Sequence, residues 1–137
     1  MLEAAMERAN WTILAAVAIG SAAGGVARHL LTEAVVRLAG QGFPWGTLFV
    51  NVSGSLAIGV LTALAAAAMP AWPVVWRHAA VTGVLGGFTT FSTFSVQTIT
   101  LLQQGQWLAA AFNVALSVGL GLAACWAGFA MIATAAR

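Results

Sequence analysis

The sequence predicts an all-α membrane protein with four spanning helices. The chain has 137 residues, of which 61% are hydrophobic and only 6% are charged, and its mean hydropathy is +0.96. Soluble domains usually carry about 25% charged residues, so a soluble fold of this length would lack the charges to cover its surface. The apolar segments have the length of a spanning helix, about 20 residues.

Composition also argues against several classes of function. Five arginines against three glutamates give a net charge of +2, which is too little basic charge for a nucleic-acid interface. Cys125 is the only cysteine, so the chain forms no intrachain disulfide and no cysteine-built metal site. The apolar segments contain no Ser/His, Cys/His or paired-carboxylate constellation, and we therefore expect no enzyme.

Hydropathy divides the chain, taken as a single domain over 1–137, into four predicted spans. Short polar or Pro/Gly-containing segments separate them, namely "GQGFPWG" at 40–46, "PAWP" at 70–73 and "QQGQ" at 103–106. Tryptophans favour the headgroup region, and five of the six fall near the predicted ends. The predicted spans are about 11–31, 47–69, 79–102 and 107–132.

Polar residues in the second and fourth spans follow a helical spacing. Residues four apart share one face of a helix, and each of these spans carries three small or polar residues at that spacing. Such stripes either pack helices together or line a pathway, and the sequence leaves both open. No carboxylate lies inside any span, so a neutral stripe that donates hydrogen bonds favours an anion over a proton or cation. The stripes are Thr47, Asn51 and Ser55, and Asn113, Ser117 and Gly121.

The third span carries "GGFTTFSTFS" at its centre, from Gly86 to Ser95. Glycines and hydroxyl residues weaken a helix, so we expect either a break near 86–90 or a polar packing seam. A break would expose carbonyls that hold a cation. It would also start a second half-helix near Phe91, capped by Thr89 or Thr90. Phe91 and Phe94 would then turn their positive ring edges towards an anion.

The arginines give little orientation signal. With four spans, Arg8, Arg77 and Arg137 fall on one side of the membrane, and Arg28 and Arg37 are expected at the first loop on the other. This near balance predicts either insertion in both orientations, and hence an antiparallel dimer, or no more than noise in a chain with few charges.

At this level of detail the chain resembles the Fluc/CrcB family of microbial fluoride ion channels. The resemblance covers all four spans, and the order and spacing of four motifs carry it. The most specific is "TGVLGGFTTFSTFS" at 82–95. The other three are "GGVARH" at 24–29, "GTLFVNVSGS" at 46–55 and "FNVALSVGLG" at 112–121.

The resemblance implies a channel that exports fluoride passively across the cytoplasmic (inner) membrane. It implies a multi-pass, dual-topology antiparallel homodimer in the lipid bilayer, with two pores and a central structural sodium ion (Na⁺). It places the sodium ligands at the backbone carbonyls of Gly86 and Thr89, and a vestibule arginine at Arg28. The implied fluoride pathway consists of Thr47, Asn51, Phe91, Phe94, Asn113 and Ser117.

The chain departs from the family pattern in two places. Many members have Glu where this chain has Gln97, and some have Tyr and Ser where it has Asn113 and Gly121.

An alternative function shares the length, hydropathy and charge balance of this chain. It is a dual-topology small multidrug transporter, which needs an embedded carboxylate that the first span lacks. A structural membrane subunit would not need polar stripes on two spans as well as a polar centre in the third.

Overall fold

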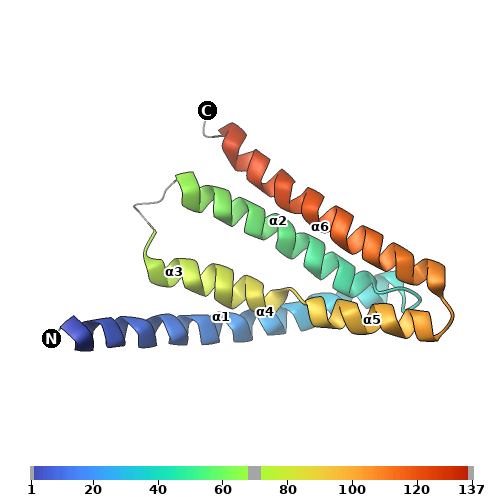
Figure 1. The fold of residues 1–137 in the computed structure, drawn as a ribbon, viewed down its shortest axis with the longest axis horizontal. Helices are drawn as coiled ribbons and strands as arrows, with labels where there is room; N and C mark the ends of the chain where they lie inside the picture. Colours follow the sequence, from blue (N-terminus) through green and yellow to red (C-terminus); the bar gives the residue numbers. More distant parts are fainter. Residues whose placement is uncertain (1, 68–71, 136–137) are drawn as a thin grey trace.

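The computed structural model describes residues 2–67 and 72–135, and all of their regular structure is helical. The helices run back and forth along one direction (Figure 1). The labelled N- and C-terminal ends lie towards one end of the molecule, and the connections at 40–44 and 104–106 lie at the other. The elements are α1 (Leu2–Ala39), α2 (Trp45–Ala67), α3 (Val74–His78), η1 (Ala79–Leu85), α4 (Gly86–Phe88), α5 (Phe91–Gln103) and α6 (Trp107–Ala135).

Four helical stretches are long and apolar enough to cross a membrane, which confirms the predicted all-helical membrane fold. They cover residues 10–39, 45–67, 74–103 and 107–134. The third comprises α3, η1, α4 and α5 in sequence, and η1 is a π-helical segment. The predicted end of the second span at residue 69 lies outside the described residues. The third begins at Val74, earlier than predicted, because Pro73 (φ −55°) suits the position before a first helical turn.

The first helix continues to Ala39, well past the predicted end of the span at Leu31. Residues 32–39 contain no glycine or proline, and Arg37 donates to Glu33 at 3.4 Å across one turn. Gly40 then ends the helix with a φ of +82°. Five of these eight residues are apolar, but Glu33 and Arg37 lower the local hydropathy, so the hydropathy pattern ends the span before the helix ends.

Arg28 therefore does not lie at the first loop, which corrects the predicted distribution of charge. It is inside α1, beside the middle of the third span, where its Nη1 donates to the carbonyl oxygen of Thr89 at 3.3 Å. The first loop side keeps Arg37, which is exposed and paired with Glu33. The predicted three-to-two distribution of arginines becomes three to one.

Glycines bring the backbones of the first and third spans into direct contact. A Cβ atom at Gly20 would lie 2.6 Å from the carbonyl oxygen of Ala79, and one at Gly24 would overlap that of Val84. The contact is reciprocal, because a Cβ at Gly87 would overlap the Ser21 carbonyl. Gly20 and Gly24 are four residues apart, as are Gly83 and Gly87 on the third span, and such small-residue seams allow membrane helices to approach closely.

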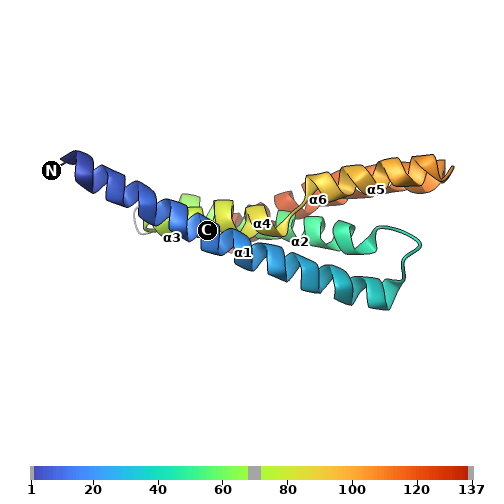
Figure 2. The same cartoon turned by 90° about the horizontal axis from the view of Figure 1, so that it is seen from below.

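A second glycine seam joins α2 to α6. A Cβ atom at Gly59 would overlap the carbonyl oxygen of Cys125, and one at Gly128 would overlap that of Leu56. Seen from below, α1 and α2 diverge from α5 and α6 towards the loop end (Figure 2). The fold thus contains two glycine-packed helix pairs, α1 with the third span and α2 with α6.

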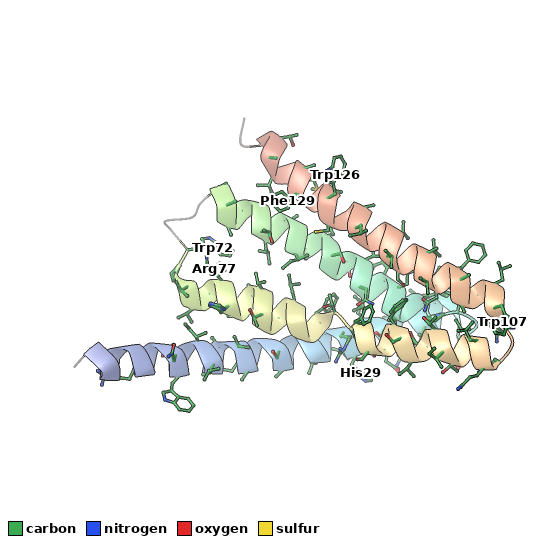
Figure 3. All side chains as sticks on the ribbon, in the orientation of Figure 1. His29, Trp72, Arg77, Trp107, Trp126 and Phe129 are labelled. Carbon is green, nitrogen blue, oxygen red and sulfur yellow. The ribbon has the colours of Figure 1, made fainter. Side chains whose placement is uncertain are left out.

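Much of the apolar surface of this single chain is uncovered, as expected of helices that face lipid or another chain. Trp107 lies where α5 turns into α6, and Trp72 lies at the opposite end (Figure 3). Trp11, Trp76 and Trp107 are all more than 60% exposed. Their placement at the two ends matches the interfacial position that indole rings prefer.

Candidate functional site

The third span changes conformation at two residues, Thr89 and Thr90, which we call the junction. Helix α4 ends at Phe88 and α5 begins at Phe91. Between them Thr89 (φ −78°, ψ 157°) and Thr90 (φ −150°, ψ 110°) are extended. The junction lies near the middle of the stretch 74–103, so it falls near mid-depth if that stretch spans the bilayer.

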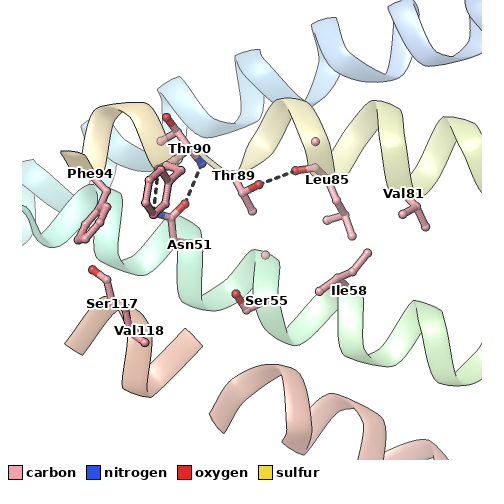
Figure 4. A pocket seen from close by; sticks show the side chains of 13 residues that line it. Asn51, Ser55, Ile58, Val81, Leu85, Thr89, Thr90, Phe94, Ser117 and Val118 are labelled. Carbon is pink, nitrogen blue, oxygen red and sulfur yellow. Dashed lines mark hydrogen bonds between the residues drawn. The ribbon is translucent and has the colours of Figure 1, made fainter. Parts of the chain in front are cut away.

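A cavity of about 400 Å³, the junction pocket, opens beside these residues (Figure 4). Helices α2 and α6 and the third span all contribute to its wall, and no charged side chain is among the described residues that line it. Its lining is Asn51, Gly54, Ser55, Ile58, Val81, Leu85, Gly86, Thr89, Thr90, Phe91, Phe94, Ser117 and Val118.

Asn51 holds the junction with both ends of its amide group. The Thr90 N–H donates to Asn51 Oδ1 at 2.8 Å, and Asn51 Nδ2 donates to the Thr90 carbonyl at 3.0 Å. This pair satisfies a backbone N–H and a backbone C=O that an extended residue takes out of the helix. Nδ2 carries two hydrogens, so one is left to donate to another acceptor, and Asn51 is part of the wall of the junction pocket.

Thr90 is the residue that caps α5, which settles the choice between Thr89 and Thr90. Its Oγ1 accepts from the Thr93 N–H at 3.2 Å and donates to Thr93 Oγ1 at 3.0 Å. The Thr89 hydroxyl donates instead to the Leu85 carbonyl at 3.0 Å. Thr90, which is buried, and Phe91, the first residue of α5, both line the junction pocket. The N-terminal end of α5, which carries positive partial charge, therefore lies at the pocket.

Two backbone carbonyls near the junction have unusual surroundings. In a continuous helix the Thr90 N–H would donate to the Gly86 carbonyl, but here it donates to Asn51. The Thr89 carbonyl accepts from Arg28. The guanidinium thus places a positive charge at the junction, and Arg28 is not among the described residues that line the junction pocket.

Phe91 and Phe94 form a tilted pair on the first turn of α5. Their ring centroids are 5.3 Å apart and their planes meet at 50°. Phe94 is 8% exposed, whereas Phe91 is 77% exposed. One ring is therefore fixed inside the chain, and the other lines the pocket but faces outwards in the single chain.

Ser117 supplies a hydroxyl without a partner. It lines the junction pocket from α6, at the same end as Phe94 (Figure 4), and its Oγ is buried with no hydrogen bond to the described residues. Gly121, one turn later, faces Ser55: a Cβ built on it would lie 3.5 Å from the Ser55 Oγ. The second and fourth helices thus bring their polar stripes together here.

Thr47 belongs to a different cavity. It is buried and lines a second cavity of about 330 Å³, the loop pocket, at the end that carries the first and third connections. The Gln97 Oε1 atom is buried without a hydrogen-bond partner among the described residues. The lining is Thr32, Val36, Gln41, Gly42, Phe43, Pro44, Gly46, Thr47, Gln97, Thr100, Leu101, Gln104 and Gln106.

Asn113 lines neither pocket. It is 1% exposed, and its Nδ2 donates to Thr98 Oγ1 at 2.9 Å. Sequence reasoning missed Thr98, which follows Phe94 by one helical turn. Its spacing from Phe94 was visible in the sequence, but its contact with α6 depends on how two helices are rotated against each other. The structure thus gathers Asn51, Gly86, Thr89, Phe91, Phe94 and Ser117 around one pocket, and leaves Thr47, Asn113 and Arg28 outside it.

Comparison with known proteins gives one consistent family. Residues 15–129 match the family model described as "CrcB-like protein, Camphor Resistance (CrcB)". A protein of Paramagnetospirillum magneticum named "Fluoride-specific ion channel FluC" is 47% identical over 115 residues, which cover 83% of this chain and 90% of that protein.

Two other relatives carry the same kind of name. "Fluoride-specific ion channel FluC" of Photobacterium profundum is 42% identical over 124 residues, covering 90% of this chain and 96% of that protein. "Fluoride-specific ion channel FluC 2" of Bradyrhizobium diazoefficiens is 49% identical over 116 residues, covering 83% and 84%. The family match includes most of each of the four helices that are long enough to cross a membrane, and this chain belongs to the CrcB family.

Proposed function

We propose that this protein is a fluoride channel of the cytoplasmic (inner) membrane, which lets fluoride leave the cell passively. The observation that carries the proposal is the junction pocket, where neutral hydrogen-bond donors and two phenylalanine rings meet midway along the third span. The names of the relatives support the choice of ion. They are names of ion channels, not of enzymes.

The chemistry of the pocket suits a small anion. Asn51 has a second amide hydrogen, the Ser117 hydroxyl has no partner among the described residues, and the edges of phenyl rings carry positive partial charge. A carboxylate would repel an anion, and the pocket has none among its described lining residues. The absence of that carboxylate also disfavours a proton-coupled multidrug transporter.

The pathway requires more than one chain in this proposal. Phe91 lines the pocket but is 77% exposed, so part of the wall is left to a second copy. A two-fold axis in the plane of the membrane keeps a residue at mid-depth when it relates one chain to the other. The junction lies near the middle of its span, so it stays at mid-depth in both chains. An antiparallel homodimer therefore brings two junctions together and forms two equivalent pores. Thr47, Asn113 and Ser117 then continue each fluoride pathway beyond Asn51.

The backbone carbonyls at the junction are suitable ligands for a structural sodium ion, although the positive charge of Arg28 lies close to one of them. Oxygen ligands suit a hard cation. The Gly86 carbonyl lacks its usual donor because Thr90 donates to Asn51. A carbonyl oxygen has two lone pairs. The Thr89 carbonyl accepts a hydrogen bond from Arg28 with one of them, and the other lone pair is left for an ion. When bound, the ion supplies fixed positive charge near the pores.

A crystal structure of the dimer tests the sodium site. We expect density on the two-fold axis within coordination distance of the Gly86 and Thr89 carbonyls of both chains. An unbroken third helix with nothing on that axis would refute this part of the proposal.

Efflux from liposomes tests the proposed function itself. Purified protein is reconstituted into vesicles loaded with fluoride or with chloride, and release is followed with ion-selective electrodes. Neutral donors in a narrow path favour the ion that fits them best, so fluoride efflux should far exceed chloride efflux. Equal rates for the two ions, or no fluoride release above that of protein-free vesicles, would exclude a fluoride-selective channel.

A further inference from the structure

Two hydrogen bonds connect α6 to the turn of α5 that carries Phe94. Asn113 Nδ2 donates to Thr98 Oγ1 at 2.9 Å, and the Thr98 hydroxyl donates to the Phe94 carbonyl at 2.8 Å. Asn113 and Phe94 are both buried, at 1% and 8% exposure. The connection crosses between helices and is shielded from solvent at both ends.

The chemistry of the hydroxyl fixes the direction of both bonds. A threonine hydroxyl has one hydrogen, and a backbone carbonyl only accepts. The Thr98 hydroxyl therefore donates its hydrogen to the Phe94 carbonyl, and its oxygen acts only as an acceptor for Asn113. Because Thr98 Oγ1 is an acceptor, it binds the NH₂ group of the Asn113 amide, so Nδ2 points towards Thr98 and Oδ1 points away from it.

The position of Thr98 makes this orientation relevant to transport. On α5, Phe91 and Phe94 line the junction pocket, whereas Gln97, Thr100 and Leu101 line the loop pocket. Thr98 lies one turn after Phe94, between Gln97 and Thr100 in the sequence, where the lining of one pocket gives way to that of the other. An ion that moves from one pocket towards the other along α5 passes this turn.

We propose that Thr98 is a positioning residue of the fluoride pathway, which holds the Asn113 amide in the orientation that offers hydrogen to an anion and ties α6 to the Phe94 turn. This inference rests on the proposed fluoride channel and adds a residue that the family resemblance did not indicate. Without the Thr98 hydroxyl, the Asn113 amide has no acceptor that fixes Nδ2 on that side. The amide can then rotate and turn Oδ1, which repels an anion, to the side where a hydrogen was offered.

The chain offers a matched control for this role. Thr12 donates to the Arg8 carbonyl at 2.9 Å within α1, is exposed, and is not among the described residues that line either pocket. Thr98→Val and Thr12→Val each delete one hydroxyl and one bond to the preceding turn. Thr98→Ser keeps the hydroxyl.

Fluoride and chloride efflux from liposomes, with dimer content checked by size-exclusion chromatography, tests the proposal. Thr98→Val should lower fluoride efflux about fivefold, the effect of one lost hydrogen bond on a rate, and lower the fluoride-to-chloride ratio. Thr98→Ser and Thr12→Val should stay near wild type. With Asn113→Leu already present, Thr98→Val should add no further loss, because the amide that it orients is gone.

Three outcomes contradict the proposal. Wild-type fluoride efflux in Thr98→Val overturns it, as does an equal added loss in the Asn113→Leu background. If Thr98→Val does not assemble, failure of Thr98→Ser to restore fluoride efflux in assembled dimers also overturns it. If the wild-type protein itself releases no fluoride, the proposed function fails first, and the role of Thr98 falls with it.

Discussion

Asn51 and Thr90 show how a single side chain both builds the site and takes part in it. Two hydrogen bonds of 2.8 and 3.0 Å replace the helical partners that Thr90 has lost. Leaving such groups unpaired inside a membrane costs several kcal/mol, roughly, so the junction depends on an amide at position 51. A carboxylate there would keep the acceptor for Thr90 N–H but lose the donor for Thr90 C=O.

Two phenylalanines in one pair occupy different environments, which gives the first prediction. Phe94 is buried and Phe91 is exposed, yet both line the junction pocket. Phe91→Ile and Phe94→Ile keep apolar bulk and delete the positive ring edge. We expect each to lower fluoride efflux about tenfold, the effect of about 1.4 kcal/mol on a barrier.

The comparison requires that both variants still assemble, which size-exclusion chromatography in detergent measures. Phe112→Ile serves as a control, because Phe112 is an exposed phenylalanine of α6 and is not among the described residues that line the pocket. Wild-type efflux in both Phe91→Ile and Phe94→Ile would mean that the rings only fill space.

Adjacent glycines on α1 give a prediction at the scale of the element. A Cβ atom at Gly24 would overlap the Val84 carbonyl and lie 2.9 Å from the Phe88 nitrogen, whereas one at Gly25 would meet nothing within 4 Å. Gly24→Ala should separate α1 from the third span and lower the unfolding midpoint in a denaturant titration. Gly25→Ala should leave it unchanged or raise it, because alanine favours a helix by up to about 1 kcal/mol over glycine.

The two variants change the same helix by the same methyl group, so helix propensity cancels between them. Equal unfolding midpoints for Gly24→Ala and Gly25→Ala would show that the backbone contact between the first and third spans contributes nothing to stability. Reduced fluoride efflux in Gly24→Ala is a further expectation, because Arg28 on the same helix reaches the Thr89 carbonyl.

Hydropathy predicted the four spanning helices because lipid requires long apolar helices whatever their contacts. It missed the helix at residues 32–39, because Glu33 and Arg37 lower the hydropathy there, and by ending the span at Leu31 it placed Arg28 near a loop. Several residues of the junction pocket, namely Asn51, Gly86, Thr89, Phe91, Phe94 and Ser117, were expected at the site from side-chain type or from the resemblance, whereas its apolar lining, such as Ile58 and Leu85, was not. The Asn113–Thr98 contact was not, because it depends on the rotation of α6 against α5, which local spacing does not encode.

At the scale of the whole molecule, the uncovered side of the junction pocket argues for a second chain, and the charges decide how that chain is oriented. Arg8 and Arg77 lie on the side of the termini, to which the sequence adds Arg137, and Arg37 lies on the other once Arg28 is placed inside α1. This three-to-one distribution is less balanced than the sequence predicted, but four arginines in all still give a weak signal under the positive-inside rule. We therefore predict that tags at either terminus are found on both faces of the membrane.

Locking the orientation makes this prediction decisive. Three lysines added between Ala67 and Trp72 should keep the termini in the cytoplasm, and three added within 103–106 should keep them outside, since positive segments stay in the cytoplasm. Each variant alone then forms no antiparallel dimer and should lose fluoride efflux from cells. Expressed together, the two variants should recover it, because each supplies the orientation that the other lacks. Full efflux from either locked variant alone, or no recovery on co-expression while both are present in the membrane, would rule out the antiparallel arrangement and leave the exposed Phe91 ring to face lipid.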